Sequence, residues 1–319
     1  PLGTSAIFSM STDNQNELTD YYANAIGGGI KFETAPFRKV QFGVSGFFIY
    51  NLKSSNLAEK DPSTDQYNRY EISLFDIEDP ENKKDIDRLE ELYIKYTGSK
   101  VTLTLGKQVI NTPFIYPQDS RMRPTEVEGF YGKFKGSNKW HFEGGWLYNI
   151  SPRSTVKWYS VAQSIGINSQ GVTLDGQPGN YKGHLSSKGI GLTGLTYKPW
   201  DQILIEVYNQ YADNLFNTAL LHAEYQQEAG NRKLKAAFQY IRQDVVRNGG
   251  NGEPDKTYFD ERNKVNVFSA RLGFEKKHWE TSLNYTRITN LDGLPCPGNG
   301  EQNPSLLISQ EKGLKVPEM

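Results

Sequence analysis

Apolar and polar residues alternate along many stretches of this chain. In residues 40–52 an apolar side chain occupies nearly every second position, and most positions between are polar or small. The same period of two runs through residues 101–105, 140–148 and 279–286. Such alternation places one face of a β-strand in an apolar medium and the other in a polar one. The stretches reach about ten residues, the length that a tilted strand needs to cross a bilayer.

Thirteen strands are predicted, and the connections between them alternate in length. The short connections are 35–39, 98–99, 136–139, 199–201, 229–231 and 277–278. The connections that alternate with these short ones, most of them long, are 12–22, 53–87, 111–125, 151–187, 213–217 and 244–263. Short turns on one side and long loops on the other are typical of outer-membrane barrels. The predicted strands are 4–11, 23–34, 40–52, 88–97, 100–110, 126–135, 140–150, 188–198, 202–212, 218–228, 232–243, 264–276 and 279–288.

A soluble lipocalin-like barrel or a β-propeller is the alternative for a chain with so many strands. Eight strands are too few for this chain, and no repeat of about 40–50 residues with blade motifs is present. We therefore predict an all-β fold, a transmembrane antiparallel β-barrel. Aromatic residues near strand ends mildly favour the membrane, where they would form girdles at the interfaces: Tyr96, Trp146, Tyr148, Tyr197, Trp200, Tyr240 and Trp279.

The composition of the chain argues against several other classes of protein. The 319 residues carry a formal net charge of -1, so bulk charge gives no reason to expect nucleic-acid binding. No run of about 18 apolar residues occurs, which excludes a membrane protein built from helices. The mean hydropathy of -0.65 suits a soluble protein and also a barrel, because a membrane strand is apolar only at alternate positions. The single cysteine, Cys296, allows no internal disulfide.

Patterns typical of catalysis, metal binding and nucleotide binding are weak. The four histidines lie far apart, with no spacing suited to a metal ion. The glycines at 27–29 precede a strand-like segment, so a bend or close strand packing is favoured over a phosphate loop. The acidic residues at 76–81 could bind a cation, but a solvated loop is the favoured interpretation. We therefore predict no cofactor, no metal and no enzymatic activity.

The connection at 111–125 differs from the other long connections. It is the third on the long-loop side and holds three prolines, one acidic residue and two arginines separated by one residue. Prolines suit a loop held in a fixed place, and in large porins the third loop commonly folds into the lumen. An arginine pair there would attract carboxylates. The alternative is a rigid loop packed on the barrel wall with its arginines in salt bridges.

The predicted pore-lining residues come from this loop and from two strands. They are Tyr116, Asp119, Arg121 and Arg123 of the loop, with Lys95 and Arg271 on strands. Three acidic residues are also predicted to face inward, Glu91, Glu143 and Glu206. The predicted charge of the lumen is therefore mixed.

Several motifs resemble those of a known family. They are residues 12–14 (Thr-Asp-Asn), 18–22 (Leu-Thr-Asp-Tyr-Tyr), 27–37, the Thr-Pro-Phe and Asp-Ser-Arg elements within 111–125, and 284–287 (Asn-Tyr-Thr-Arg). Over residues 4–290 the chain resembles the OprD family of outer-membrane porins, particularly the versions found in Bacteroidetes-type bacteria. The resemblance implies an eighteen-stranded barrel, monomeric or loosely trimeric, in the outer membrane of a Gram-negative bacterium. It also implies selective diffusion of small solutes such as amino acids, peptides or carboxylates.

The chain departs from that family after residue 290. We assign residues 1–290 to a partial barrel of about thirteen strands and residues 291–319 to a tail outside the barrel. Read one base out of frame, residues 296–309 can encode Ser-Arg-Glu-Trp-Gly-Thr-Glu-Pro-Phe-Phe-Thr-Tyr-Phe, which resembles what the family carries after its Asn-Tyr-Thr-Arg strand. We therefore predict that the tail from about Leu294 is translated in a shifted frame, which the gene sequence tests. The alternative is a divergent loop.

Three classes of function remain for such a barrel. A porin for passive diffusion is the main prediction, with the outer-membrane bilayer and small solutes as its partners. A barrel enzyme would need a serine, a histidine and an acid at one level, and no histidine has both at a matching height. A structural or adhesive barrel without a transport role is the alternative, supported only by the large connections at 53–87 and 151–187.

Overall fold

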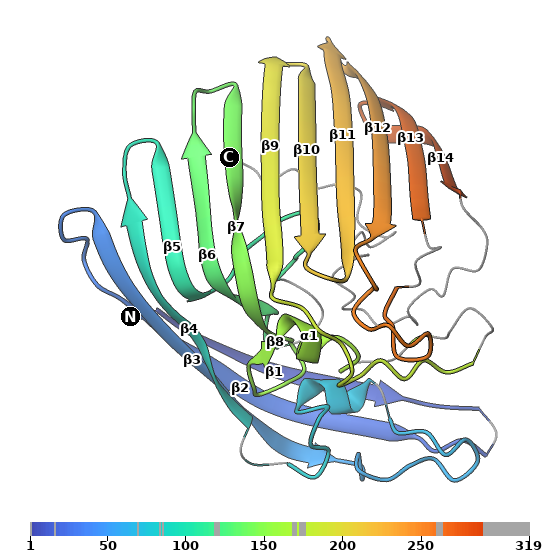
Figure 1. Cartoon of the computed structure of the whole chain (residues 1–319). Coiled ribbons are helices and arrows are strands. Elements are labelled where there is room, and N and C mark those ends of the chain that lie inside the picture. The colour runs from blue at the N-terminus through green and yellow to red at the C-terminus, as the bar shows by residue number, and fades with distance from the viewer. Residues whose placement is uncertain are drawn as a thin grey trace.

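The computed structural model shows one curved antiparallel sheet (Figure 1). It describes residues 2–15, 17–68, 70–82, 84, 86–117, 122–167, 171, 177–259 and 264–289. The long strands are β1 (Leu2–Thr12), β2 (Tyr21–Glu33), β3 (Val40–Ser54), β4 (Ile86–Thr97), β5 (Val101–Gln108), β6 (Glu126–Lys135), β7 (Trp140–Ser151), β9 (Ile190–Trp200), β10 (Ile203–Ala212), β11 (Phe216–Ala229), β12 (Arg232–Val245), β13 (Lys264–Lys276) and β14 (Trp279–Thr289).

The long strands follow one another across the sheet in chain order. The short strand β8 (Tyr159–Ser160) lies off this path and pairs with β7. Within the described residues, the other elements are the 3-10 helix η1 (Glu71–Leu74) and the one-turn helix α1 (Val161–Ser164). Neither of these two short helices could span a bilayer. The predicted thirteen strands in one curved sheet, each paired with its neighbours in sequence, are confirmed; the predicted tail at 291–319 lies outside the described residues.

The connections divide between the two ends of the sheet as predicted. Figure 1 shows tight turns along one end and the longer connections gathered at the other. The β2–β3 turn is closed by a backbone bridge between Phe37 and Val40, with Arg38 and Lys39 at positive φ. The two ends are called the short-turn end and the long-loop end below. β1 and β14 form the two edges of the sheet.

The two faces of the sheet differ in polarity. The outer face carries exposed apolar side chains, for example Phe238, Leu272 and Leu283, with exposed fractions of 43%, 60% and 73%. Cross-strand register places Leu272 opposite Leu283, so these residues share one face. The inner face is covered by loops toward the long-loop end and carries charged residues toward the short-turn end. The predicted alternation therefore separates an outer apolar surface from a mixed inner one.

The seven aromatic residues predicted for the interfaces share the outer face. Trp200 and Trp279 are 66% and 53% exposed, and Trp140 stacks on Tyr197 with ring centroids 3.8 Å apart. Tyr240 packs against Phe268, its cross-strand partner on the outer face. Rings at the ends of outward-facing strands are where aromatic girdles lie in membrane barrels. The girdle itself stays a prediction.

A charge on the outer face should oppose insertion into lipid. We expect Phe238→Arg to destabilise the inserted sheet by about 2–4 kcal/mol, because Phe238 lies in the middle of β12 on the outer face. The neighbouring change Gln239→Arg on the inner face should cost much less. Urea unfolding of each variant from lipid vesicles, followed by tryptophan fluorescence, measures the difference. Equal losses for both variants would show that the faces are assigned wrongly.

Candidate functional site

The connection between β5 and β6 folds onto the inner face of the sheet. Thr112 closes its first turn: the Thr112 Oγ1 accepts hydrogen bonds from the amides of Phe114 (3.3 Å) and Ile115 (2.9 Å). Phe114 and Ile115 are each 3% exposed and belong to a core cluster with inner-face residues of β6, β7, β9 and β10. Phe114 meets the ring of Tyr208 edge to face, with centroids 6.5 Å apart. This half of the connection therefore covers one side of the inner wall.

The later part of the same connection reaches a different part of the wall. Met122 packs against a second core cluster, formed by inner-face residues of β2 and β3 and by the segment around η1. Gly27 of β2 leaves room for it, because a Cβ on Gly27 would lie 2.8 Å from the Met122 Cε. The two described ends of this loop thus contact different parts of the concave side of the sheet.

Arg123, predicted to line the pore, is buried at this second contact. It is 2% exposed, and its Nη2 donates a hydrogen bond of 2.8 Å to the backbone oxygen of Phe75. Burial, followed by the charge of Arg88, lowers the pKa of the Arg123 guanidinium below its usual range. The contact is with a backbone carbonyl rather than with a carboxylate. Arg123 therefore holds the loop to the segment before β4, and its pore-lining role stays a prediction.

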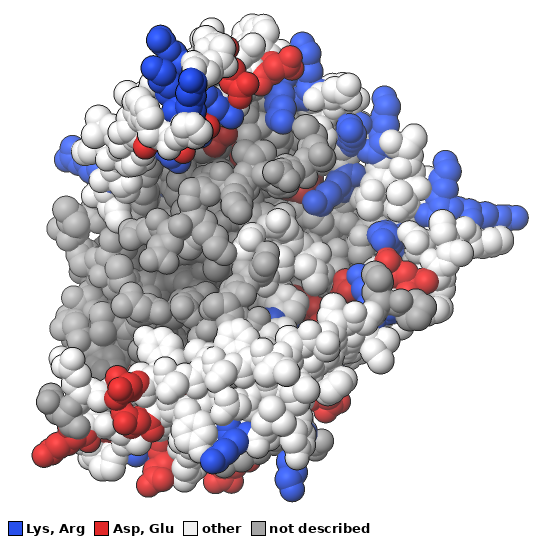
Figure 2. All heavy atoms as spheres, turned by 180° about the vertical axis from the view of Figure 1, so that it is seen from behind, with Lys and Arg blue, Asp and Glu red and all other residues white. Residues whose placement is uncertain are grey.

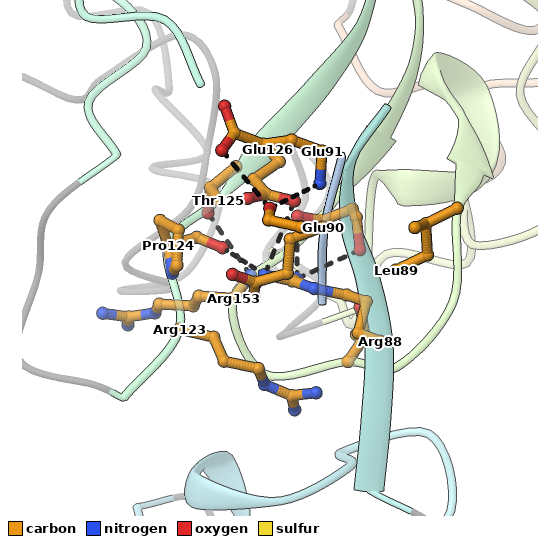
Figure 3. Close-up of polar contacts among 12 residues, drawn as sticks. Arg88, Leu89, Glu90, Glu91, Arg123, Pro124, Thr125, Glu126 and Arg153 are labelled. Carbon is orange, nitrogen blue, oxygen red and sulfur yellow. Dashed lines mark hydrogen bonds and ion pairs between the residues drawn. The ribbon is translucent and has the colours of Figure 1, made fainter. Parts of the chain in front are cut away.

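Arg88 of β4 joins three segments at the same place (Figure 3). Its Nη2 lies 2.7 Å from Glu90 and donates to the backbone oxygen of Pro124 at 2.8 Å. Its Nη1 donates to the hydroxyl of Ser151 (3.1 Å) and to the backbone oxygen of Pro152 (3.2 Å). The side chain of Arg88 is fully buried, so these contacts form away from competing water. Arg88 thereby fixes the end of the 111–125 loop to β4 and β7.

Sequence reasoning missed Arg88. Its partners lie as far as 64 residues away in the chain, which no local pattern reveals. The signal available was a charged residue at the start of a predicted strand, two positions before Glu90 and three before Glu91. Glu126, at the start of β6, completes the cluster 3.9 Å from Arg88 and is 1% exposed.

The inner wall toward the short-turn end carries ion pairs. Lys31 lies 2.7 Å from Glu91, and Lys95 lies 2.9 Å from Glu33. On β6 and β7, Lys133 lies 3.3 Å from Glu143. Tyr208 of β10 donates a 2.7 Å hydrogen bond to Glu143 of β7, two strands away. Cations and carboxylates therefore alternate around this part of the wall.

The structure brings the other predicted residues to different places. Lys95 and Arg271 both lie on the inner face, Lys95 paired with Glu33 and Arg271 3.1 Å from Glu280. Tyr116 is half-buried in the loop. Asp119 and Arg121 lie outside the described residues, so their pore-lining role stays a prediction. Among the described residues, no group of three or more His, Cys, Asp or Glu side chains could hold a metal ion.

Comparison with known proteins identifies the family. The family model "outer membrane porin, OprD family" matches residues 39–296, which is most of the chain. The chain belongs to the OprD family of outer-membrane porins. The members of this family are channels rather than enzymes, and they lie in the outer membrane of Gram-negative bacteria. No curated protein matches the chain.

Solved structures agree with this porin in fold. OccAB3 of Acinetobacter baumannii has a TM-score of 0.66 at 14% identity, over 90% of this chain and 65% of that one. OccD3 (OpdP) of Pseudomonas aeruginosa has a TM-score of 0.61 at 15% identity, over 90% and 56%. OpdK of Pseudomonas aeruginosa, solved with vanillate, has a TM-score of 0.60 at 13% identity, over 90% and 65%. The porin chain thus spans between 56% and 65% of the length of these relatives, and identities this low establish the fold alone.

Removing Arg88 should release the loop of this porin from the wall. We expect Arg88→Met to cost about 3–5 kcal/mol of unfolding free energy, because it leaves buried Glu90 and Glu126 without their cation. Trypsin should also cleave the 111–125 loop faster in the variant. The matched change Arg38→Met, at an exposed turn, should change stability by less than about 0.5 kcal/mol. Wild-type stability and cleavage in the Arg88 variant would contradict this assignment.

Proposed function

We propose that this porin passes small polar solutes across the outer membrane by selective passive diffusion. The observation that carries the proposal is the 111–125 loop, whose described ends are anchored on different parts of the concave inner wall. A loop held there narrows the path between the strands, and the charged wall beside it can discriminate among solutes. The family match favours this function over a structural or adhesive barrel.

The proposed solutes are amino acids, peptides or carboxylates. The inner wall offers both signs of charge within one short stretch, for example Lys133 and Glu143, with the hydroxyl of Tyr208 beside them. A zwitterion or a carboxylate with hydroxyl groups fits such a wall better than an apolar solute. The carboxylate vanillate, present in the OpdK structure, belongs to this class.

Lys95 and Arg271 are proposed to line the path, because both lie on the inner face at positions accessible to solutes. Tyr116 is proposed to line it from the loop. We propose that Arg123 acts by holding the loop in place, from its hydrogen bond to Phe75. The protein is proposed to act as a monomer or a loose trimer and to carry out no catalysis.

Liposome swelling tests the transport proposal directly. The reconstituted protein should admit amino acids and small carboxylates faster than neutral sugars of equal size. Swelling rates should fall as solutes grow beyond the width that the loop leaves. Vesicles that contain folded protein and swell no faster than empty vesicles would refute the proposal.

Ion selectivity should respond in opposite directions to the two members of one wall pair. Lys133→Gln leaves Glu143 without its cation and should raise cation preference about two- to threefold at low salt. Glu143→Gln leaves Lys133 unpaired and should raise anion preference by a similar factor. Reversal potentials in planar bilayers measure both changes. Arg287→Gln, on the outer face of β14, is the control and should leave selectivity unchanged.

If both wall variants keep the wild-type reversal potential while the protein still conducts, the solute path does not pass Lys133 and Glu143. Conduction would then support the channel and contradict its proposed lining.

A further inference from the structure

The short-turn end of β12, β13 and β14 carries three cations close together in the sheet. Arg232 is the first residue of β12 and lies directly opposite Lys276, the last residue of β13. Lys277 follows in the β13–β14 turn at positive φ. Lys276 is in turn paired with Trp279, the first residue of β14. Three positive charges and an indole ring therefore meet at one corner of the sheet.

Cross-strand register places Arg232 and Lys276 on the outer face. Leu234 lies opposite Phe274 two residues further along, and Leu272 follows on the same face. Leu234, Leu272 and Trp279 are exposed by 47%, 60% and 53%. The intervening positions, among them Lys233, Lys235 and Arg271, point to the inner face. The cation pair thus stands at the margin of the surface that faces lipid.

The acidic residues of this corner are engaged on the other face. Glu228 lies 3.1 Å from Lys233, and Glu275 lies 2.8 Å from Lys235. Glu280 lies between Lys235 (3.2 Å) and Arg271 (3.1 Å). Among the described residues, no carboxylate pairs with Arg232, Lys276 or Lys277. At this corner the inner-face charges are therefore paired, whereas Arg232 and Lys276 on the outer face have no ion pair among the described residues.

Two like charges directly opposite each other across a strand pair repel, since their Cβ atoms lie about 5 Å apart. An anion placed between Arg232 and Lys276 would remove this repulsion. A phosphate group suits them, because a guanidinium binds two phosphate oxygens at once and an ammonium group adds a point charge.

The neighbouring rings set the depth of this corner in the bilayer. Phe274 and Trp279 form a ring pair on the outer face, with centroids 5.5 Å apart. Exposed tryptophans lie at the level of the lipid headgroups, so the cations beside Trp279 reach the layer that holds the phosphates. Figure 2 shows further Lys and Arg side chains along the edge of the molecule that holds the short turns. Arg38, Lys39, Lys100, Lys135 and Lys139 lie at or beside these turns and are exposed.

We propose that Arg232, Lys276 and Lys277 form a binding site for the phosphate of an anionic phospholipid in the leaflet on the short-turn side. Short turns face the periplasm in outer-membrane barrels, so this is the inner leaflet. The acyl chains of the bound lipid lie along Leu234, Phe274 and Leu272. The site is on the outer surface and is independent of the solute that passes through the lumen.

Native mass spectrometry of the purified chain in detergent tests the site, with phosphatidylglycerol and phosphatidylcholine as the two probes. The wild-type chain should retain phosphatidylglycerol over phosphatidylcholine, and rising salt should reduce the difference. The triple change Arg232→Gln, Lys276→Gln and Lys277→Gln should weaken phosphatidylglycerol retention at least about tenfold, given roughly fivefold for each charge removed near the headgroups.

The matched control changes the same number of charges at the opposite end. Lys53→Gln, Lys188→Gln and Lys264→Gln replace three exposed lysines near the long loops and should leave retention unchanged. If the first triple variant fails to fold by circular dichroism, the charge-keeping swap Arg232→Lys with Lys276→Arg takes its place and should retain the lipid.

Three outcomes would overturn the proposal. One is equal retention of the two lipids by the wild-type chain. Another is an equal loss in the two triple variants, which would indicate general surface charge instead of a site. The third is displacement of phosphatidylglycerol by an equal concentration of glycerol phosphate, which would indicate a site for a soluble phosphate.

Discussion

Backbone hydrogen bonding in lipid is the constraint on which this structure depends. A strand inside a bilayer has no water to satisfy its N–H and C=O groups, so each must pair with the next strand. The antiparallel ladder from β1 to β14 provides this pairing on both sides of every long strand between the two edges. Because side chains alternate along each strand, the same ladder fixes which residues meet lipid and which face inward. A slip of one residue would exchange the two sets and bring Lys235 and Glu280 into lipid.

The distribution of charge follows from the two environments of the sheet, lipid at its outer face and a polar, partly enclosed space at its inner face. On the inner face, cations and carboxylates sit within reach of each other across neighbouring strands, as Lys31 and Glu91 do at 2.7 Å. Pairing lowers the cost of holding charge in a partly enclosed space. On the outer face the strand middles are apolar, and charge is confined to the ends of strands, where Arg232 and Lys276 lie. An outward-facing residue is thus apolar in the middle of a strand and can be charged only near the end of one.

Part of the concave face of the sheet is covered by a packed hydrophobic core. The 111–125 loop brings Phe114 and Ile115 against the wall and places Met122 on a different part of it. Both interpretations of this loop from the sequence contain part of the observed arrangement. Its described residues lie on the inner face, which the porin interpretation requires, and they pack on the wall, as the alternative predicts. Arg123 satisfies a backbone carbonyl instead of a carboxylate, which neither interpretation anticipated.

The strands, their two faces and the family could be predicted from the amino-acid sequence. Period-two alternation is a local property, because each side chain responds to the medium on its own side of the strand. The short turns could also be located from the sequence, because each lies where the alternation of one strand ends and that of the next begins. Tertiary structure decided the site: Arg88 meets Ser151 and Arg123 meets Phe75 only after segments 63 and 48 residues apart come together. It also decided that Glu228, Glu275 and Glu280 turn toward the lumen side while Arg232 and Lys276 are left outside, because pairing across strands depends on register, and register is set by the whole sheet.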